Sequence, residues 1–188
     1  DDTVIVVTSD HGEGLGEHGE KTHGVFAYNT TLHVPFIIYA PGSVKAGAVV
    51  DRRVRHIDLM PTVLDILGMP APDSISGESL VALMAGRDNG KAPDSYFEAM
   101  FGYYNRGWAP PQGLYSDDLK FIRLPLAELY DMKTDPGQRT SVAAEHQDVV
   151  AELTRFYDEV YPSLCRHDDD FARPIVGSAK DQETWLSS

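Results

Sequence analysis

Cysteine and basic residues are scarce in this chain of 188 residues. A single cysteine, Cys165, excludes an internal disulfide framework. Lysine and arginine total 16 against 29 acidic residues, which gives a formal net charge of −13. A protein that binds the phosphate backbone needs a basic surface that displaces counterions, so this balance argues against a nucleic-acid partner. A small anionic substrate stays compatible with the charge, because a bound cation reverses the local field.

The sequence also lacks a long apolar run and a targeting signal. No stretch approaches the roughly 20 residues of a membrane span, so we expect no membrane-spanning segment. The start, Asp1-Asp2-Thr3, does not have the pattern of a signal peptide, and localisation receives no prediction. Hydrophobic residues nevertheless make up 42% of the chain, which is enough to bury a core. The length fits one ordinary domain or a large piece of a bigger one.

Two short apolar runs in the first half predict buried strands. They are TVIVVTS, residues 3–9, and VPFIIYA, residues 34–40. β-Branched, apolar runs of this length are typical of strands that are covered on both faces in a parallel sheet. Pro41-Gly42 ends the second run. These runs favour an α/β fold.

Helical periodicity appears in two segments. In the first, apolar residues recur at i, i+3, i+4 and i+7: Met60, Val63, Leu64 and Leu67. With Asp58 as N-cap and Gly68 as the stop, this spacing predicts a helix over 58–67. In the second, an apolar stripe from Val149 to Val160 predicts an amphipathic helix over roughly 143–160.

The remaining segments define an expected organisation. Three strand-like pieces, SYFEAM, LKFIRL and ELYDM, begin within 95–130 and predict a small antiparallel sheet with a hairpin turn at 116–118. A short helix is expected to end near Met84, and YYNRGWAPPQG receives no assignment. We therefore expect an α/β portion over 1–92, a small antiparallel subdomain with a helix over 93–162, and a tail over 163–188.

The stretch TSDHGEGLGEHGEKTHG, residues 8–24, places acids and histidines directly after the first predicted strand. Ligands of open α/β sheets bind beyond the carboxyl ends of strands, where Asp10 and His11 stand. A carboxylate and a neutral imidazole are both good ligands for a divalent metal. Gly12 is expected to let the strand break, because glycine tolerates backbone angles that other residues avoid. The pair predicts a metal site; the alternative is that Asp10 starts a turn and His11 is an incidental loop residue.

Several acids and histidines follow, and not all of them can be ligands. Glu17 and Glu20 are expected to be solvated. His18 is expected to orient a ligand rather than to be one. Glu13 is expected to anchor the loop or to orient a metal ligand.

Four stretches together resemble the sulfatase family within the alkaline phosphatase superfamily: TSDHGEGLGEHG, HVPFIIYAPG, HIDLMPTVLDILG and ELYDMKTDPGQRTSVA. They cover about residues 3–143 in the family's order. The ending Ser141-Val142-Ala143 departs mildly from the family's usual Asn-Leu-Ala. The resemblance implies a partial alkaline-phosphatase-like α/β sandwich with a mixed, mostly parallel sheet. It also implies a small antiparallel C-terminal subdomain with a packed helix.

The family's nucleophile motif, Cys-x-Pro-Ser-Arg, is absent, because Cys165 lies in SLCRHDDD. The paired acids near the family's N-terminus, which complete the metal site, are absent as well. The residues indicate the same incompleteness, since two buried strands are too few for a parallel sheet and two ligands too few for a metal. We therefore expect the C-terminal part of a longer enzyme, inactive alone, with the missing N-terminal part as its partner.

The resemblance implies a metal-dependent sulfuric ester hydrolase that acts on a small anionic ester. It assigns Asp10 and His11 as ligands of a divalent cation, with calcium, manganese, zinc and magnesium all open. His23, in THG, is implied to be either a second metal ligand or the catalytic cation that holds the ester. A plain loop histidine is the third alternative for that position.

Two other functions stay open. Many formylglycine sulfatases have Asp-Asn where this chain has Asp10-His11, and Asp-His occurs in phosphonate and phosphate ester hydrolases of the superfamily. A metal-dependent phosphodiesterase, phosphonate hydrolase or phosphotransferase is therefore the first alternative. A non-catalytic C-terminal module is the second. The nucleophile would distinguish a sulfatase from the other enzymes.

Overall fold

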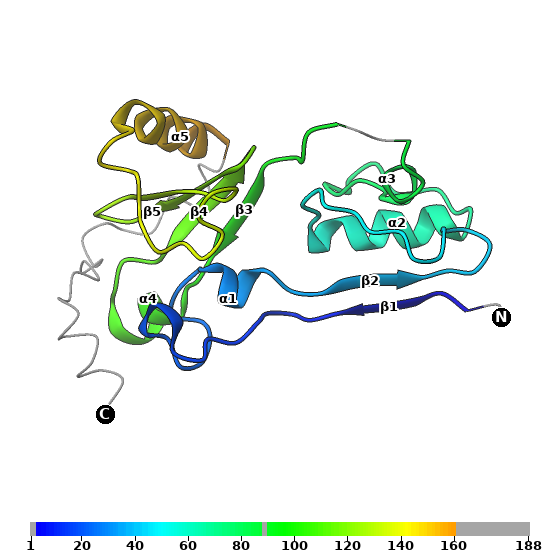
Figure 1. Ribbon diagram of the computed structural model, residues 1–188, viewed down its shortest axis with the longest axis horizontal. Helices are drawn as coiled ribbons and strands as arrows, with labels where there is room; N and C mark the ends of the chain where they lie inside the picture. Colours follow the sequence, from blue (N-terminus) through cyan, green and yellow to red (C-terminus); the bar gives the residue numbers. More distant parts are fainter. Residues whose placement is uncertain (1–2, 88–89, 161–188) are drawn as a thin grey trace. The chain divides into compact units, whose positions relative to one another are not determined.

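The computed structural model describes residues 3–87 and 90–160 (Figure 1). They divide into two compact units, of which the first contains residues 3–9, 35–87 and 90–93. The second contains residues 10–34 and 94–160. The architecture is α/β, and each unit has its own antiparallel sheet. The tail predicted over 163–188 lies outside the described residues.

The first unit contains the two strands predicted from apolar runs. Strand β1 (Ile5–Thr8) pairs with β2 (Phe36–Tyr39), with Ile5 opposite Tyr39 and Thr8 opposite Phe36. The pairing is antiparallel, so the expected parallel arrangement is not found among the described residues. The physical reason is that β-branched, apolar composition favours a strand and its burial but does not encode its direction.

The helices of the first unit are η2 (His56–Asp58), α2 (Leu59–Ile66) and α3 (Val81–Met84). The predicted helix over 58–67 and the short helix ending near Met84 are confirmed. Gly68 has a φ of 67° and ends α2, as predicted, because only glycine adopts this left-handed conformation without strain.

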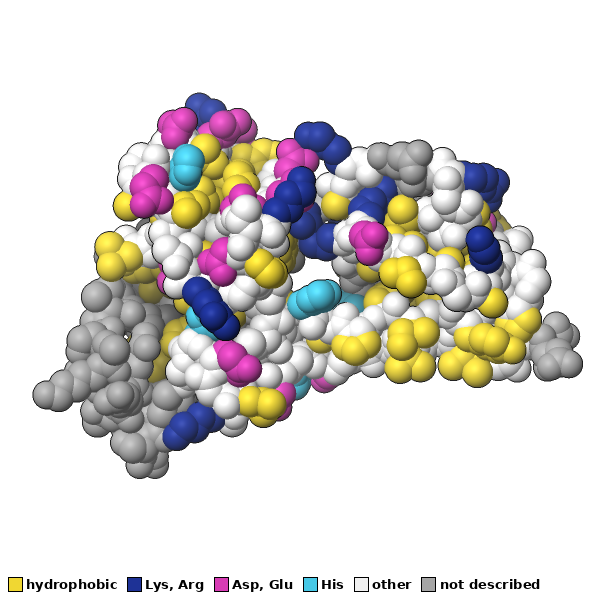
Figure 2. Space-filling view, viewed as in Figure 1, with side chains coloured by type: hydrophobic (Ala, Val, Ile, Leu, Met, Phe, Trp, Pro, Cys, Tyr) yellow, Lys and Arg dark blue, Asp and Glu magenta, His cyan; other side chains and the backbone are white. Residues whose placement is uncertain are grey.

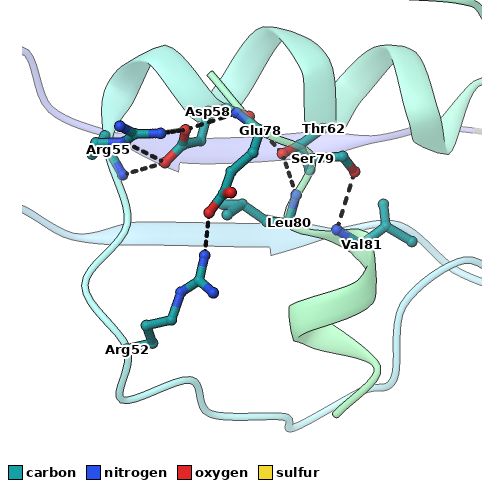
Figure 3. Close-up of polar contacts among 8 residues, drawn as sticks. All are labelled: Arg52, Arg55, Asp58, Thr62, Glu78, Ser79, Leu80 and Val81. Carbon is teal, nitrogen blue, oxygen red and sulfur yellow. Dashed lines mark hydrogen bonds and ion pairs between the residues drawn. The ribbon is translucent and has the colours of Figure 1, made fainter. Parts of the chain in front are cut away.

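Asp58 occupies the predicted N-cap position of α2, but its side chain makes no capping hydrogen bond to that helix. Its fully buried carboxylate accepts hydrogen bonds from the backbone N–H of Arg55 at 2.8 Å, from the Arg55 guanidinium and from the backbone N–H of Glu78 (Figure 3). Thr62 Oγ1 donates to the Asp58 carbonyl and accepts from the Leu80 N–H at 3.0 Å. Asp58 therefore caps the η2 turn and ties the helix pair to the segment that leads into α3.

The second unit contains a four-stranded antiparallel sheet in the order β3 (Ser95–Glu98), β4 (Gln112–Ser116), β5 (Leu119–Arg123) and β6 (Glu128–Asp131). This confirms the predicted small antiparallel sheet and its hairpin turn, where Asp117 has a φ of 47°. The sheet has one strand more than predicted, because β4 had no assignment. Helix α4 (Phe101–Arg106) occupies part of the stretch that had no assignment. Helix α5 (Gln147–Val160) confirms the predicted C-terminal helix and begins four residues later than expected.

Both faces of this sheet are covered. On one face, Leu114 and Phe121 pack with Leu153 and Tyr157 of α5. The opposite face carries a second cluster. Its sheet residues include Phe97, Ile122 and Tyr130, and residues before β2 pack on them: Ala27, Tyr28 and Leu32. The 10–34 segment contains η1 (Glu17–Gly19) and α1 (Asn29–Leu32). The segment that bears the predicted site is therefore packed on the C-terminal sheet.

Candidate functional site

Asp10, His11 and Gly12 follow β1 and begin the 10–34 segment. The backbone N–H of Gly12 donates to the Thr31 carbonyl at 2.8 Å. A Cβ at position 12 would lie 2.1 Å from the Thr30 carbonyl oxygen, which is far inside van der Waals contact. The φ of Gly12 is not positive, so our expected reason for glycine was wrong. Glycine is needed because two backbones approach closely.

The loop that follows folds back on itself through further backbone bonds. Gly14 donates its N–H to the Thr22 carbonyl at 2.7 Å, and Gly16 donates to the Glu20 carbonyl at 2.8 Å. A Cβ at Gly14 would lie 2.7 Å from the Glu20 carbonyl oxygen. These bonds place the outgoing and returning arms of the loop side by side. Residues 11–13 therefore meet residue 23.

The meeting point contains Asp10, His11, Glu13 and His23, which we name the acid–histidine cluster. The rings of His11 and His23 stack with centroids 3.9 Å apart and an interplanar angle of 28°. His23 Nδ1 lies 3.2 Å from Glu13 Oε2, and His11 Nε2 lies 3.7 Å from Asp10 Oδ2. The His11 backbone N–H donates to Asp10 Oδ1 at 3.0 Å. The structure thus brings four of the five predicted site residues into contact.

The geometry of His11 suits a metal ligand. Its Nδ1 lies 2.7 Å from the Gly12 carbonyl oxygen, so Nδ1 carries the proton and the lone pair resides on Nε2. Metal-binding histidines commonly donate their second nitrogen to a backbone carbonyl in this way. Within residues 3–87 and 90–160, however, no group of three or more His, Cys, Asp or Glu side chains is arranged to hold a metal ion. Asp10 and His11 therefore fit part of a coordination sphere.

His18 lies elsewhere on the loop. Its ring stacks on Tyr28 with centroids 3.7 Å apart, and its Nε2 lies 3.1 Å from the Gly137 carbonyl oxygen. Burial lowers the pKa of His18, and the hydrogen bond to Gly137 opposes this shift. These contacts tie the loop to the turn that follows β6. The proposed role of His18 in orienting a ligand stays a prediction.

The two remaining loop acids differ. Glu17 is exposed, as expected, and accepts the Leu15 N–H; backbone hydrogen bonds lower its pKa. Glu20 is only 2% exposed, so the expectation that it is solvated was wrong. Its carboxylate accepts the N–H groups of Val25 at 2.9 Å and Phe26 at 3.3 Å, and burial raises its pKa. The signal for a buried Glu20 was its place in a glycine-rich turn, because such a turn has many backbone N–H donors that need an acceptor.

Sequence reasoning also missed two anchors outside the loop. Lys120 of β5 is fully buried and donates to the Ala27 carbonyl at 2.6 Å. Gln138, 1% exposed, accepts the Asn29 N–H through Oε1 at 2.7 Å. Both contacts join residues about a hundred positions apart, and no local pattern in the sequence predicts such pairs.

Known proteins resemble this chain in sequence and in structure. The family model described as N-sulphoglucosamine sulphohydrolase, C-terminal, matches residues 16–161. The chain is 32% identical to N-acetylglucosamine-6-O-sulfatase of Bacteroides thetaiotaomicron, over 94% of this chain and 33% of that protein. The solved structure of BT4656 in complex with its substrate D-glucosamine-2-N,6-O-disulfate gives a TM-score of 0.69 at 31% identity, over 89% of this chain and 36% of that one. The structure of phosphonate monoester hydrolase SpPMH from Silicibacter pomeroyi gives a TM-score of 0.68 at 28% identity, over 92% of this chain and 38% of that one.

The chain belongs to the sulfatase family and corresponds to the C-terminal part of its members. It spans about a third of the length of the curated relatives it matches, 33% and 36% for the two Bacteroides sulfatases. Among the described residues, none of the helices has the length and apolarity that crossing a bilayer requires.

Proposed function

We propose that the full-length protein is a metal-dependent sulfuric ester hydrolase, to which this chain contributes part of the metal site and part of the anion site. The observation that carries the proposal is the acid–histidine cluster, in which His11 lies beside Asp10 and stacks on His23. The relatives that share this part of the chain have names that describe sulfatases. The substrate class is a small anionic ester.

In this proposal, the Asp10 carboxylate and His11 Nε2 hold a divalent cation. Such a cation, when bound, supplies Lewis-acid stabilisation of the ester oxygens and favours an ionised nucleophile. The donor set of one carboxylate and one imidazole suits zinc or manganese better than calcium or magnesium. His11 is held in the required tautomer by the Gly12 carbonyl.

His23 acts on the anion. Its ring is oriented by the Glu13 carboxylate, which lies 3.2 Å from Nδ1. Because the rings of His11 and His23 lie in nearly parallel planes, their in-plane lone pairs do not converge on one ion. This supports a role in stabilising charge on the transferring group or the leaving oxygen over a role as third ligand of the same cation.

The N-terminal part of the same enzyme supplies the nucleophile and the remaining metal ligands. It also covers the apolar residues that the first unit leaves on its surface. Ile5, Val7, Ile37 and Tyr39 are each about half exposed, and Figure 2 shows hydrophobic side chains gathered over β1 and β2. Alone, this chain has no catalytic nucleophile and is inactive.

One alternative has an observation in its favour. The phosphonate monoester hydrolase SpPMH matches 92% of this chain at 28% identity, almost as well as the sulfatases. A phosphonate hydrolase, phosphodiesterase or phosphotransferase would use the same Asp10 and His11. A non-catalytic module would use neither.

The deciding experiment measures kcat/KM of the full-length protein for an aryl sulfate, an aryl phosphate and an aryl phosphonate, before and after removal of metal by chelation. We expect the aryl sulfate to be the best substrate and chelation to abolish turnover. A higher kcat/KM for the phosphonate or phosphate would establish the alternative enzyme class. No turnover of any ester with metal restored would establish the non-catalytic module.

Two variants test the metal ligand. His11→Ala should lower metal affinity and kcat/KM by about 100-fold or more, because a directly bound ligand is lost. His11→Asn should retain some binding and shift the preference toward calcium, which takes oxygen ligands. His146→Ala, at an exposed histidine before α5, is the matched control. Unchanged metal preference in both His11 variants would refute the assignment.

A further inference from the structure

Lys120 is a buried lysine in a place where an apolar residue would fill the core. It is the second residue of β5, is 0% exposed and shares a sheet face with Ile122. This is the face that residues 27–32 cover. Lysine is almost never fully buried unless its amino group has partners, so its contacts indicate what it does.

The Lys120 amino group reaches the 27–29 stretch. Its Nζ donates to the Ala27 carbonyl at 2.6 Å and lies 3.4 Å from Asn29 Oδ1. The rings of Phe97, Tyr115 and Tyr28 surround it, with centroids 5.0, 5.1 and 5.9 Å from Nζ. Tyr115 also donates its hydroxyl hydrogen to Asn29 Oδ1.

The environment accommodates the amino group as a donor. Burial lowers the pKa of Lys120 to about 6, and the Glu128 carboxylate opposes this shift. Near neutral pH the group is therefore largely an amine, whose N–H bonds still donate to the Ala27 carbonyl. A buried donor of this kind costs less than a buried ammonium and retains the same directional contact.

A continuous set of contacts leads from Lys120 to the acid–histidine cluster. Ala27 begins the 27–31 stretch, and the Thr31 carbonyl at its far end accepts the Gly12 N–H at 2.8 Å. Gly12 in turn holds His11 through the 2.7 Å contact between its carbonyl oxygen and Nδ1. His23 precedes Ala27 by only four residues. The sheet thus holds both ends of the site loop through one anchored stretch.

We propose that Lys120 is a positioning residue, whose amino group fixes the Ala27 carbonyl and thereby sets where His11 and His23 lie. It touches no substrate, and its effect on catalysis rests on the function proposed above. Its effect on the order of the loop does not rest on that function, so the two can fail separately.

The test is hydrogen exchange on the full-length protein, comparing wild type with Lys120→Met, which keeps length and removes the donor. Lys133→Met is the matched control, because Lys133 is an exposed lysine whose partner is Asp118. We expect amides in residues 10–34 to exchange about 10-fold faster or more in Lys120→Met, with α5 unchanged, since the loop is released locally. Equal acceleration in both segments, or none, would overturn the proposal.

Steady-state kinetics separates positioning from general stability. Lys120→Met should lower kcat by about 10-fold with little change in KM at temperatures where it is fully folded, because small displacements of catalytic groups are costly. Leu114→Ala, which opens the core on the α5 face, should lower the melting temperature without this loss of kcat. An equal loss of kcat in both variants would assign Lys120 a purely structural role.

A milder variant covers the case in which Lys120→Met does not fold. Lys120→Gln keeps an N–H donor on a shorter side chain. Its amides in residues 10–34 should exchange faster than in wild type but more slowly than in a released loop, with α5 as the internal reference. Loop exchange indistinguishable from wild type in Lys120→Gln would overturn the proposal. Failure of both variants to fold, with Lys133→Met folded, would overturn it in favour of a core role.

Discussion

The two antiparallel sheets of this chain are covered to very different degrees. In the four-stranded sheet, Leu114 and Phe121 are 0% exposed, because α5 covers one face and residues 27–32 cover the other. In the two-stranded sheet, Ile37 and Tyr39 are 58% and 56% exposed, although their strand is just as apolar. In the apolar stripe of α2, Met60 is 61% and Leu67 is 57% exposed, while Val63 and Leu64 are partly buried.

The difference shows which residues bury the apolar side chains of each unit. The second unit has two clusters of buried apolar side chains, one on each face of its sheet, formed by residues of the same unit. The first unit has a two-stranded sheet, which is marginal by itself, and a broad set of exposed apolar residues. Its core is completed by further chain in our proposal. The predictions below can break or sharpen this comparison.

The largest effect is expected from supplying this chain without the rest of the enzyme. The isolated 188-residue chain should show no hydrolysis of an aryl sulfate or aryl phosphate, because in our proposal the nucleophile and the remaining metal ligands belong to the N-terminal part of the enzyme. Full-length protein made in parallel is the positive control. Metal-dependent turnover by the isolated chain, free of contaminants, would refute the proposal that further chain completes the active site.

Core substitutions should reveal the difference as free energy of unfolding. In the isolated chain, Leu114→Ala should cost about 2–5 kcal/mol, while Ile37→Ala should cost under about 1 kcal/mol because its side chain is largely exposed. In the full-length protein, Ile37→Ala should cost about 2 kcal/mol or more if further chain covers it. Chemical denaturation of both lengths provides the measurement. A small cost of Ile37→Ala in both the isolated chain and the full-length protein would refute the proposal that further chain covers Ile37.

The stability of the second unit should depend on pH through Lys120. Its pKa is lowered from 10.5 to about 6 in the folded state, so between these values the unfolded chain binds one more proton. The free energy of unfolding should therefore rise with pH by up to about 1.4 kcal/mol per pH unit from pH 6 to 10, and this increment should be lost again as pH falls toward 6.

The groups that face Lys120 define the control for this titration. They are Glu128, Tyr28, Tyr115 and Tyr130, and burial raises the pKa of Tyr28 and Tyr130. The Tyr28 and Tyr130 hydroxyls stay neutral in this window because of the raised pKa values, so Lys120→Met should flatten the profile. A profile that keeps its slope in Lys120→Met would show that another group is responsible.

The smallest effect is expected at the surface of the well-covered unit. Lys133 and Asp118 form an ion pair at 2.5 Å, but both side chains are more than half exposed. Lys133→Met should therefore leave the free energy of unfolding almost unchanged, which thermal denaturation can check. A loss comparable to that of Leu114→Ala would mean that burial does not rank the contacts of this unit.

Periodic patterns in the sequence predicted most of the secondary structure. The spacing from Met60 to Leu67 placed α2, and the strand-like composition of LKFIRL placed β5. The direction of β1 against β2 was not predictable, because identical apolar runs serve parallel and antiparallel pairs. Helix α4 was missed because its aromatic residues and the nearby Pro110-Pro111 carry no helical period.

At the candidate site, residue types were predictable and contacts were not. Asp10 and His11 were singled out because a metal requires such ligands, and the glycines indicated a tight loop. The buried roles of Glu20 and Lys120 were missed, because a charged residue between apolar or glycine neighbours normally indicates solvent. Their partners are backbone groups, whose positions only the folded chain defines.

The packing of residues 10–34 on the C-terminal sheet has a consequence for protein synthesis. The contact from Lys120 to Ala27 joins residues 93 positions apart, and that from Gln138 to Asn29 joins residues 109 apart. A ribosome therefore releases the loop with His11 and His23 long before the strands that anchor it exist. Contacts between residues this distant in sequence form late and slowly. The nascent loop therefore lacks these two contacts until translation passes Gln138.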